Sequence, residues 1–172
     1  KDIALRRMFA LMIPRTLGLA VTQLNLFVET IIASTLASGS IAVFALTNNL
    51  QSAPVGIIGI SFAIAAFPSL SQFAAEKKIE EMTTHLASAI RQILFFIVPV
   101  TILFLLLRAQ IVRVALGSGE FDWTATIATS NALAFFSLSL FAQCLTPLLA
   151  RTFYALHDTW TPFVVGIISV LV

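Results

Sequence analysis

The sequence predicts an all-α fold, a polytopic bundle of about five transmembrane helices. The chain is 59% hydrophobic and only 10% charged, whereas soluble domains are about 25% charged. From Thr16 to Ala75, Glu29 is the only charged residue. A membrane helix needs about 20 predominantly apolar residues, so this stretch alone is long enough for two crossings.

Charged connections and helix breakers divide the chain into apolar segments, which we treat as one transmembrane region over residues 1–172. The expected helices are residues 8–37, 41–73, 83–107, 123–154 and 161–172. The second and fourth exceed the length of one crossing, which predicts tilt or protruding ends rather than extra spans. The last stops soon after Pro162, so we expect a fragment of a longer membrane protein.

The first expected helix carries a polar stripe. Its members follow a 3-4-3-4 spacing that places them on one helix face: Arg15, Gly18, Thr22, Asn25 and Glu29. A charged side chain at the bilayer centre costs at least ~2.5 kcal/mol unless it faces a protein interior or a wet cavity. The stripe therefore favours a hydrated, functional cavity. A purely structural network of hydrogen bonds between helices is the alternative.

The second expected helix begins with a polar run over residues 47–52, Thr-Asn-Asn-Leu-Gln-Ser, ahead of Pro54. A proline removes a backbone donor and bends a helix. A discontinuous membrane helix also leaves backbone groups free to meet a ligand. Two interpretations stay open: these side chains contact a substrate, or they satisfy the hydrogen bonds of the kinked backbone.

Small residues continue this helix at helical spacing. They are Ser52, Gly56, Gly59, Ala63 and Ala66. Such a stripe lets two membrane helices approach each other closely. We therefore expect this face to pack against a neighbouring helix.

The third and fourth expected helices contain Pro99 and Pro147 and are otherwise largely apolar. Between them, the loop over residues 108–122 first alternates apolar and basic side chains and then contains a Gly-Ser-Gly sequence. That pattern is typical of a short interfacial helix followed by a turn. Arg91, near one end of the third helix, is expected to extend its charge to the interface.

The distribution of lysine and arginine predicts the orientation. Of the ten, two lie between the third and fourth helices, namely Arg108 and Arg113. The other eight lie on the opposite side of the predicted membrane. Because cytoplasmic loops carry the excess of basic residues, we expect the N-terminus in the cytoplasm.

Composition and motifs exclude several classes of protein. The net charge is only +2 and no basic cluster exceeds two adjacent residues, which does not suit a nucleic-acid partner. Cys144 is the only cysteine, which excludes an internal disulfide and a cysteine-based zinc site. The sequence has no phosphate-binding glycine loop, no HExxH and no nucleophile elbow. We therefore expect no enzyme activity and no cofactor, and the residues identify no metal.

The connection between the fourth and fifth helices carries a family resemblance. It reads Arg-Thr-Phe-Tyr-Ala-Leu-His-Asp-Thr-Trp-Thr-Pro over residues 151–162. This strongly resembles the R-x-F-Y-A-x-x-D-T-x-T-P signature of the MurJ/MviN lipid II flippases, within the multidrug, oligosaccharidyl-lipid and polysaccharide exporter superfamily. Further similar stretches are residues 12–18, 54–59, 67–71 and 119–121. The resemblance covers the whole chain and aligns it with the seventh to eleventh of the family's fourteen helices.

The resemblance implies a two-lobed transporter of the bacterial inner (cytoplasmic) membrane. Such a protein carries the undecaprenyl-diphosphate-linked peptidoglycan precursor, lipid II, across the bilayer by alternating access, for cell wall biosynthesis. The partners are then this lipid, the bilayer and the missing helices of the same protein. The expected substrate-binding residues are Arg15, Asn25, Asn49 and Gln51. Glu29 is the expected ion-coupling residue, for sodium or protons.

The chain departs from the family pattern at two positions. Asn49 stands where many members have an arginine, so a cation expected near the diphosphate is missing. Glu29 stands where many members have aspartate or asparagine. The alternatives are another exporter of the superfamily, for drugs or polyprenyl-linked polysaccharides, and a membrane scaffold that transports nothing.

Overall fold

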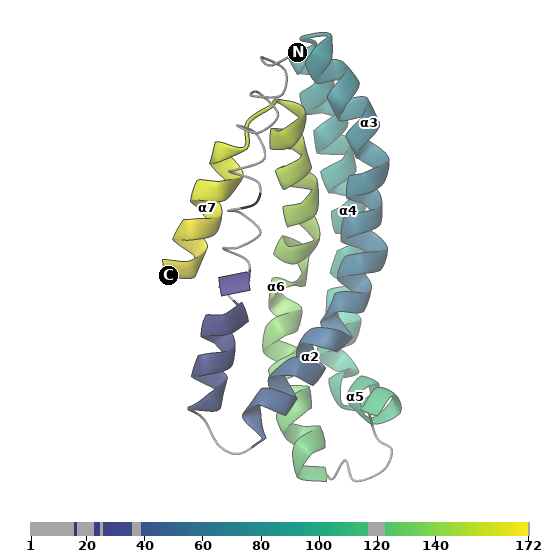
Figure 1. Cartoon of the computed structure of the whole chain (residues 1–172). Coiled ribbons are helices and arrows are strands. Elements are labelled where there is room, and N and C mark those ends of the chain that lie inside the picture. The colour runs from purple at the N-terminus through teal and green to yellow at the C-terminus, as the bar shows by residue number, and fades with distance from the viewer. Residues whose placement is uncertain (1–15, 17–22, 25, 36–38, 117–122, 172) are drawn as a thin grey trace.

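The computed structural model describes residues 16, 23–24, 26–35, 39–116 and 123–171. Within these ranges all regular structure is helical, so the all-α prediction is confirmed. The elements are α2 (Ser40–Pro54), the π-helical turn η1 (Val55–Ile60), α3 (Ser61–Ala75), α4 (Ile79–Leu106), α5 (Arg108–Leu116), α6 (Trp123–Ala155) and α7 (Trp160–Leu171). Residues 26–34, ahead of α2, are also helical (Figure 1).

Three helices in the described ranges are long and apolar enough to cross a membrane. They are the continuous helix Ser40–Ala75 of 36 residues, α4 with 28 residues and α6 with 33 residues. At 1.5 Å per residue the first extends about 54 Å, well beyond the roughly 30 Å hydrocarbon core. It must therefore tilt or protrude. The apolar part of α7 is shorter, and most of the expected helix 8–37 lies outside the described residues.

The α4 helix begins at Ile79, four residues before the start expected at residue 83. Glu80 and Glu81 precede the expected start at residue 83, because charged residues mark the expected connections between apolar segments. In the structure both lie in the first turn of α4, where negative side chains are stabilised by the helix dipole. The connection from α3 is therefore only the turn that contains Lys77 and Lys78.

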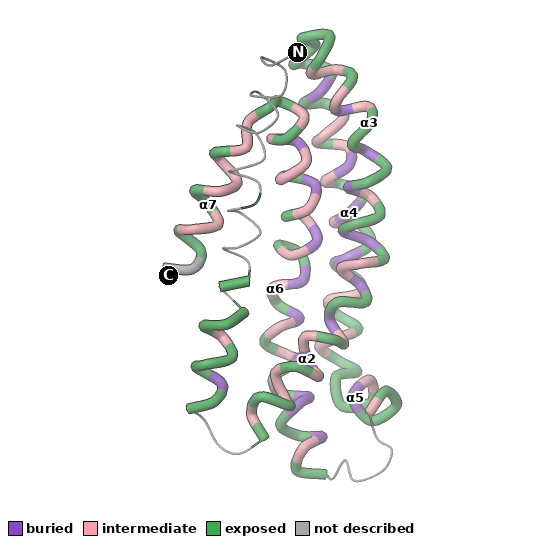
Figure 2. Tube along the Cα trace, viewed as in Figure 1, coloured by how far each residue is buried: buried purple, intermediate pink, exposed green. Residues whose placement is uncertain are grey.

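Helix α6 is central to the bundle and contacts α2, α3, α4 and α5 (Figure 1). Its inward face carries fully buried leucines, Leu133, Leu140 and Leu148, at the seven- and eight-residue spacing of one helix face. Buried residues lie on the inward faces of the neighbouring helices as well (Figure 2). Large apolar side chains such as Phe95 and Phe135 are exposed on the outside. That distribution suits a bundle whose outer surface meets lipid.

Pro54 does not interrupt the helix that contains it, so the discontinuous helix considered from the sequence is not formed. The chain continues from α2 through η1 into α3. The Val55 N–H donates to the carbonyls of Gln51 and Ser52, and the Ser61 hydroxyl donates to the Gly56 carbonyl oxygen at 3.3 Å. The π-helical turn thus accommodates the proline while its backbone keeps local partners.

Backbone meets backbone where η1 packs on α6. A β-carbon added to Gly59 would lie 2.7 Å from the Cα of Cys144 and 2.9 Å from its carbonyl oxygen. Ala63 and Ala66, on the same face, are buried, so the packing role predicted for the small-residue stripe is confirmed for these three. The stripe is nonetheless shorter than predicted, since Ser52 is exposed and a β-carbon on Gly56 would meet nothing within 4 Å.

The short helix expected after residue 108 is α5. It lies at the end of the bundle opposite the α3–α4 and α6–α7 turns (Figure 1). Val112 is fully buried, and the Arg113 guanidinium lies 5.4 Å from the centroid of the Trp123 ring. One apolar anchor and a cation–π contact therefore hold α5 against the bundle. The turn expected after it falls on residues 117–122, outside the described residues.

Candidate functional site

The polar run of α2 lies where α2 packs against α6. Thr47 and Gln51 are buried, and their four-residue spacing places them on one face of α2. The Thr47 hydroxyl donates to the Val43 carbonyl oxygen at 2.7 Å. This buried hydroxyl is therefore satisfied within its own helix.

Gln51 joins a network of side chains from both helices. Its Nε2 donates to Asn48 Oδ1 at 3.0 Å, and its Oε1 accepts from Gln143 Nε2 at 3.2 Å. Gln143 Nε2 also donates to Ser139 Oγ at 2.7 Å. Gln51 is only 3% exposed, so in this arrangement its amide serves helix packing. A buried polar network with its members hydrogen-bonded fixes one arrangement of the two helices.

The other face of the polar run is exposed and not packed. Asn49 and Ser52 are exposed, and the Ser52 hydroxyl donates to the Asn49 carbonyl oxygen at 2.7 Å. The Asn49 amide makes no hydrogen bond to any residue that the structure describes. The backbone-satisfying interpretation holds for Thr47 and Ser52, whose hydroxyls donate to carbonyls of their own helix. Contact with a substrate stays a prediction, for which Asn49 is the exposed side chain.

Glu29 lies on the helical stretch 26–34 and is half-buried. Ala33, one turn later on the same face, is buried, whereas Phe27 and Ile31 are exposed. Glu29 and Ala33 thus lie on the more covered face of this stretch, and Phe27 and Ile31 lie on the exposed one. Within the described part of the chain, no lysine or arginine pairs with Glu29. Arg15 and Asn25, the other stripe residues expected to bind substrate, lie outside the described residues.

No group of three histidine, cysteine, aspartate or glutamate side chains that could hold a metal ion occurs among the described residues. In that part of the chain, an ion site at Glu29 would rest on one carboxylate. The remaining ligands would have to come from backbone carbonyls, hydroxyls or other helices. The described residues thus supply one charged ligand and no complete metal site.

The signature connection forms a defined end to α6. The Asp158 N–H donates to the Phe153 carbonyl at 2.9 Å, and the His157 N–H donates to the Tyr154 carbonyl at 3.0 Å. His157 has a φ of 59°. This is the Schellman pattern of helix termination, with a histidine in the left-handed position that glycine usually occupies.

The same connection also begins α7. One carboxylate oxygen of Asp158 accepts the Trp160 and Thr161 N–H groups, each at 3.0 Å. The other accepts the Thr161 hydroxyl at 2.5 Å. The Thr161 hydroxyl, with the Thr161 and Trp160 N–H groups, lowers the pKa of Asp158. Pro162 follows in the first turn, where a missing N–H costs little. The aspartate, threonine and proline of the signature therefore act as a helix cap.

Gln143 was not among the predicted site residues, although its Nε2 donates to Gln51 Oε1 across 92 positions of sequence. The sequence nevertheless contains a pattern that could have identified Gln143. Ser139 and Gln143 are four residues apart in an otherwise apolar helix, and a membrane-embedded amide normally has a partner on another helix. What the sequence could not supply was which helix carries the partner.

Comparisons with known proteins agree along the whole chain. The family model described as "Lipid II flippase MurJ" matches residues 1–172. Proteins named "Probable lipid II flippase MurJ" from Vibrio cholerae and Rhizobium tropici are 29% and 31% identical over 99% and 97% of this chain, covering 33% and 31% of their own lengths. The chain spans about a third of the length of these curated relatives. A solved structure of lipid II flippase MurJ in an inward closed conformation matches with a TM-score of 0.83 at 24% identity, over 99% of this chain and 36% of that one.

Proposed function

Because the chain belongs to the lipid II flippase MurJ family, we propose that it is part of a longer transporter that moves lipid II across the bacterial inner membrane for peptidoglycan synthesis. The observation that carries the proposal is the family match over residues 1–172. The three membrane-length helices support it, because the diphosphate and sugars of a lipid-linked precursor cannot cross hydrocarbon without polar partners.

Within this function we assign different roles to the two polar faces of α2. Asn49 is exposed and its amide lacks a described partner, so it is available to donate to the substrate headgroup. Gln51 is buried and bonded to Gln143, so it acts by holding α2 against α6. Arg15 and Asn25 remain proposed headgroup contacts on the basis of the polar stripe alone.

Glu29 is the proposed coupling residue, for sodium or protons. Its support is that it is the only acid from Thr16 to Ala75 and is half-buried, one turn before the buried Ala33. A carboxylate kept at membrane depth marks an ion or proton path more often than a packing contact.

The orientation is part of the proposal. Lys77, Lys78 and Arg151 lie at the end of the bundle that holds the α3–α4 and α6–α7 turns, whereas Arg108 and Arg113 lie at the other end. By the positive-inside rule we propose that the first of these ends is cytoplasmic, as is the expected cytoplasmic N-terminus.

The test of function is rescue of growth in bacteria depleted of their own lipid II flippase. The whole protein that contains this chain should restore growth, and Glu29→Gln should reduce rescue at equal membrane expression. Thr30→Val is the matched control, since Thr30 is the exposed neighbour of Glu29 and should tolerate the change. If the wild-type protein is well expressed and cannot rescue, the proposal is wrong and the exporter and scaffold alternatives stand.

A second experiment tests the role of Asn49. Asn49→Arg should leave detergent stability unchanged and strengthen binding of a polyprenyl-diphosphate glycan at low salt, since a charge-assisted contact is about twice as strong as a neutral one. If the variant is instead destabilised and binds no better, Asn49 faces a neighbouring helix and this lobe does not contact the diphosphate.

A further inference from the structure

The packed face of the long helix Ser40–Ala75 changes by one residue at η1. Before this turn the buried residues follow a 4-3-4 spacing and are Thr47, Gln51, Pro54 and Ile58. After it the same spacing begins again at the very next residue, with Gly59, Ala63, Ala66 and Leu70. Neighbouring residues of an α-helix point about 100° apart, so these are two different stripes. The single π-helical turn contains the extra residue that joins them.

Helix α2 also carries a second stripe, which suits a helix without the extra residue. Counted back from Gly59 at α-helical spacing, it consists of Val55, Ser52 and Asn48, each one position after a buried residue. Ser52 is exposed, and the other two are half-buried. A β-carbon added to Gly56, beside this stripe, would meet nothing within 4 Å. The second stripe is thus largely uncovered and has no side chain too large to pack on α6.

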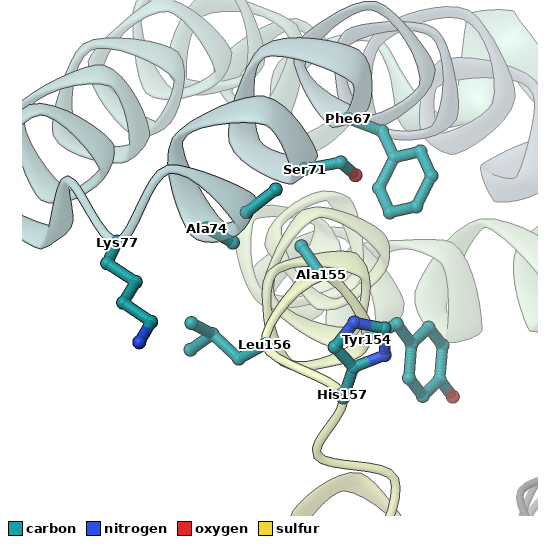
Figure 3. A pocket seen from close by; sticks show the side chains of 9 residues that line it. Phe67, Ser71, Ala74, Lys77, Tyr154, Ala155, Leu156 and His157 are labelled. Carbon is teal, nitrogen blue, oxygen red and sulfur yellow. The ribbon is translucent and has the colours of Figure 1, made fainter.

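Backbone contacts hold the α3 side of η1 against α6. Gly59 lies directly on the backbone of Cys144. At the far end of α3 the small residues Ala74 and Ala155 line one pocket between the ends of α3 and α6, so the two helices remain neighbours there (Figure 3). Any rotation at η1 therefore falls on α2 and not on α3.

Side-chain bonds, in contrast, hold α2 in its observed position. Gln51 accepts from Gln143 at 3.2 Å and donates to Asn48 at 3.0 Å. These bonds can be exchanged without moving a backbone contact. The turn itself also suits two forms, because the Ser61 hydroxyl donates to the carbonyl five residues before it, that of Gly56, and a serine in an α-helix donates to the carbonyl four residues before it.

We propose that η1 is a rotary joint that gives α2 two rotational positions. In the first position, which the structure shows, Gln51 faces α6 and Asn49 and Ser52 face away from it. Conversion of the π-helical turn into α-helix turns α2 by about 100° about its own axis. Ser52 and Asn48 then face α6, in the second position.

The rotation changes the chemistry of the exposed side of α2. In the first position that side is polar or small, with Asn49, Ser52 and Gly56. In the second position, helical spacing brings Leu46 and Leu50 to the side away from α6. The joint therefore exchanges a polar surface for an apolar one. The inference rests on the contacts of α2 with α6 and holds whether or not the protein transports lipid II.

The test is the distance between two spin labels, measured by double electron–electron resonance on the whole protein that contains this chain, in lipid nanodiscs and a cysteine-free background. One label is attached at Ala53→Cys on α2, where the native residue is exposed. The partner label is at Phe95→Cys on α4 or at Val165→Cys on α7, both exposed positions, which gives two directions of measurement. Rotation by about 100° moves a side chain on a helix of about 5–6 Å radius by about 8 Å. A label at Ile64→Cys on α3, also exposed, is the matched control, because α3 does not rotate.

Two changes shift the two positions in opposite directions. Gln143→Leu removes the donor to Gln51 Oε1, so it should raise the second population relative to the first by about five-fold, the effect of one hydrogen bond. Deletion of Ile57, which is 72% exposed, removes the extra residue, and a continuous α-helix then keeps Gln51 toward α6. Deletion of Ile64 is the matched control, since it introduces an offset within the packed stripe of α3.

We expect one main Ala53 distance in the wild type, a second distance in Gln143→Leu, and a single distance when Ile57 is deleted from either protein. The label on α3 should give one distance throughout. Deletion of Ile57 should leave the thermal midpoint near that of the wild type, whereas deletion of Ile64 should lower it. A single, unchanged distance in Gln143→Leu would show that the turn is static and overturn the joint. A second distance that persists without Ile57, or a protein that does not fold without it, would also overturn it.

Discussion

Replacing Gly59 with alanine tests the contact between η1 and α6 directly. The added carbon would lie 2.7 Å from Cys144 Cα, whereas carbon atoms in contact are about 3.5–4.0 Å apart. Both neighbouring atoms of Cys144 belong to the backbone, so no change of rotamer can relieve the overlap. The two helices must separate locally by about 1 Å.

The cost follows from that separation. Overpacking an interior destabilises the protein by about 1–3 kcal/mol. Replacing glycine by alanine within a helix stabilises the helix by up to about 1 kcal/mol, which offsets part of that loss. We expect Gly59→Ala to lower the unfolding free energy by about 1–2 kcal/mol. Gly56→Ala is the matched control, because a β-carbon there meets nothing within 4 Å. It should be neutral, or more stable by up to about 1 kcal/mol.

The assay is unfolding of both variants in mixed detergent micelles, followed by circular dichroism, with the unfolding midpoint as the readout. The two substitutions add the same methyl group three residues apart, so detergent effects cancel in their difference. If Gly59→Ala is as stable as Gly56→Ala, the backbone contact is not formed in the protein and the reasoning fails.

Three other predictions follow from the bonds and charges of the bundle. Gln143→Leu should lower the unfolding free energy by about 1 kcal/mol, because Gln51 Oε1 would be left buried without its donor. Asp158→Asn should lower the thermal unfolding midpoint at neutral pH, and the difference from wild type should shrink below about pH 4. The folded-state pKa of Asp158 is lowered, so the cap stabilises above the unfolded pKa and is lost as the pH falls through the folded one. In a cysteine-free background on intact cells, a membrane-impermeant maleimide should label cysteine at position 118 and not at position 78.

Each of these has a clear contrary result. A Gln143→Leu protein as stable as wild type would show that the network contributes nothing net. A constant difference between Asp158→Asn and wild type from neutral pH to about pH 3 would mean that the carboxylate charge is not what caps α7. Labelling at 78 alone would reverse the orientation.

Periodicity predicted the packed face of the second helix only in part, and the π-helical turn explains why. Gly59, Ala63 and Ala66 lie on the packed face, whereas Ser52 and Gly56 do not. A stripe drawn at 100° per residue assumes uniform α-helix. The wider turn over Val55–Ile60 rotates everything after it relative to α2. A local change in helix geometry cannot be read from residue spacing.

The candidate site, like the packed face of the second helix, was predicted only in part. The polar run of α2 was identified, but the division between buried Gln51 and exposed Asn49 depends on where α6 lies. That is a property of contacts distant in sequence, which periodicity does not contain. The signature connection was identified from its sequence motif. That it ends one helix and caps the next is shown only by the hydrogen bonds of His157 and Asp158.

The meeting of Gly59 with Cys144 also has a mechanical consequence. Side chains at an interface can change rotamer and let two helices slide, but peptide backbones in contact have no such freedom. The long helix Ser40–Ala75 and α6 therefore transmit displacements to each other stiffly at this level. Any movement of one of these helices relative to the other must therefore be smaller at this contact than at their ends.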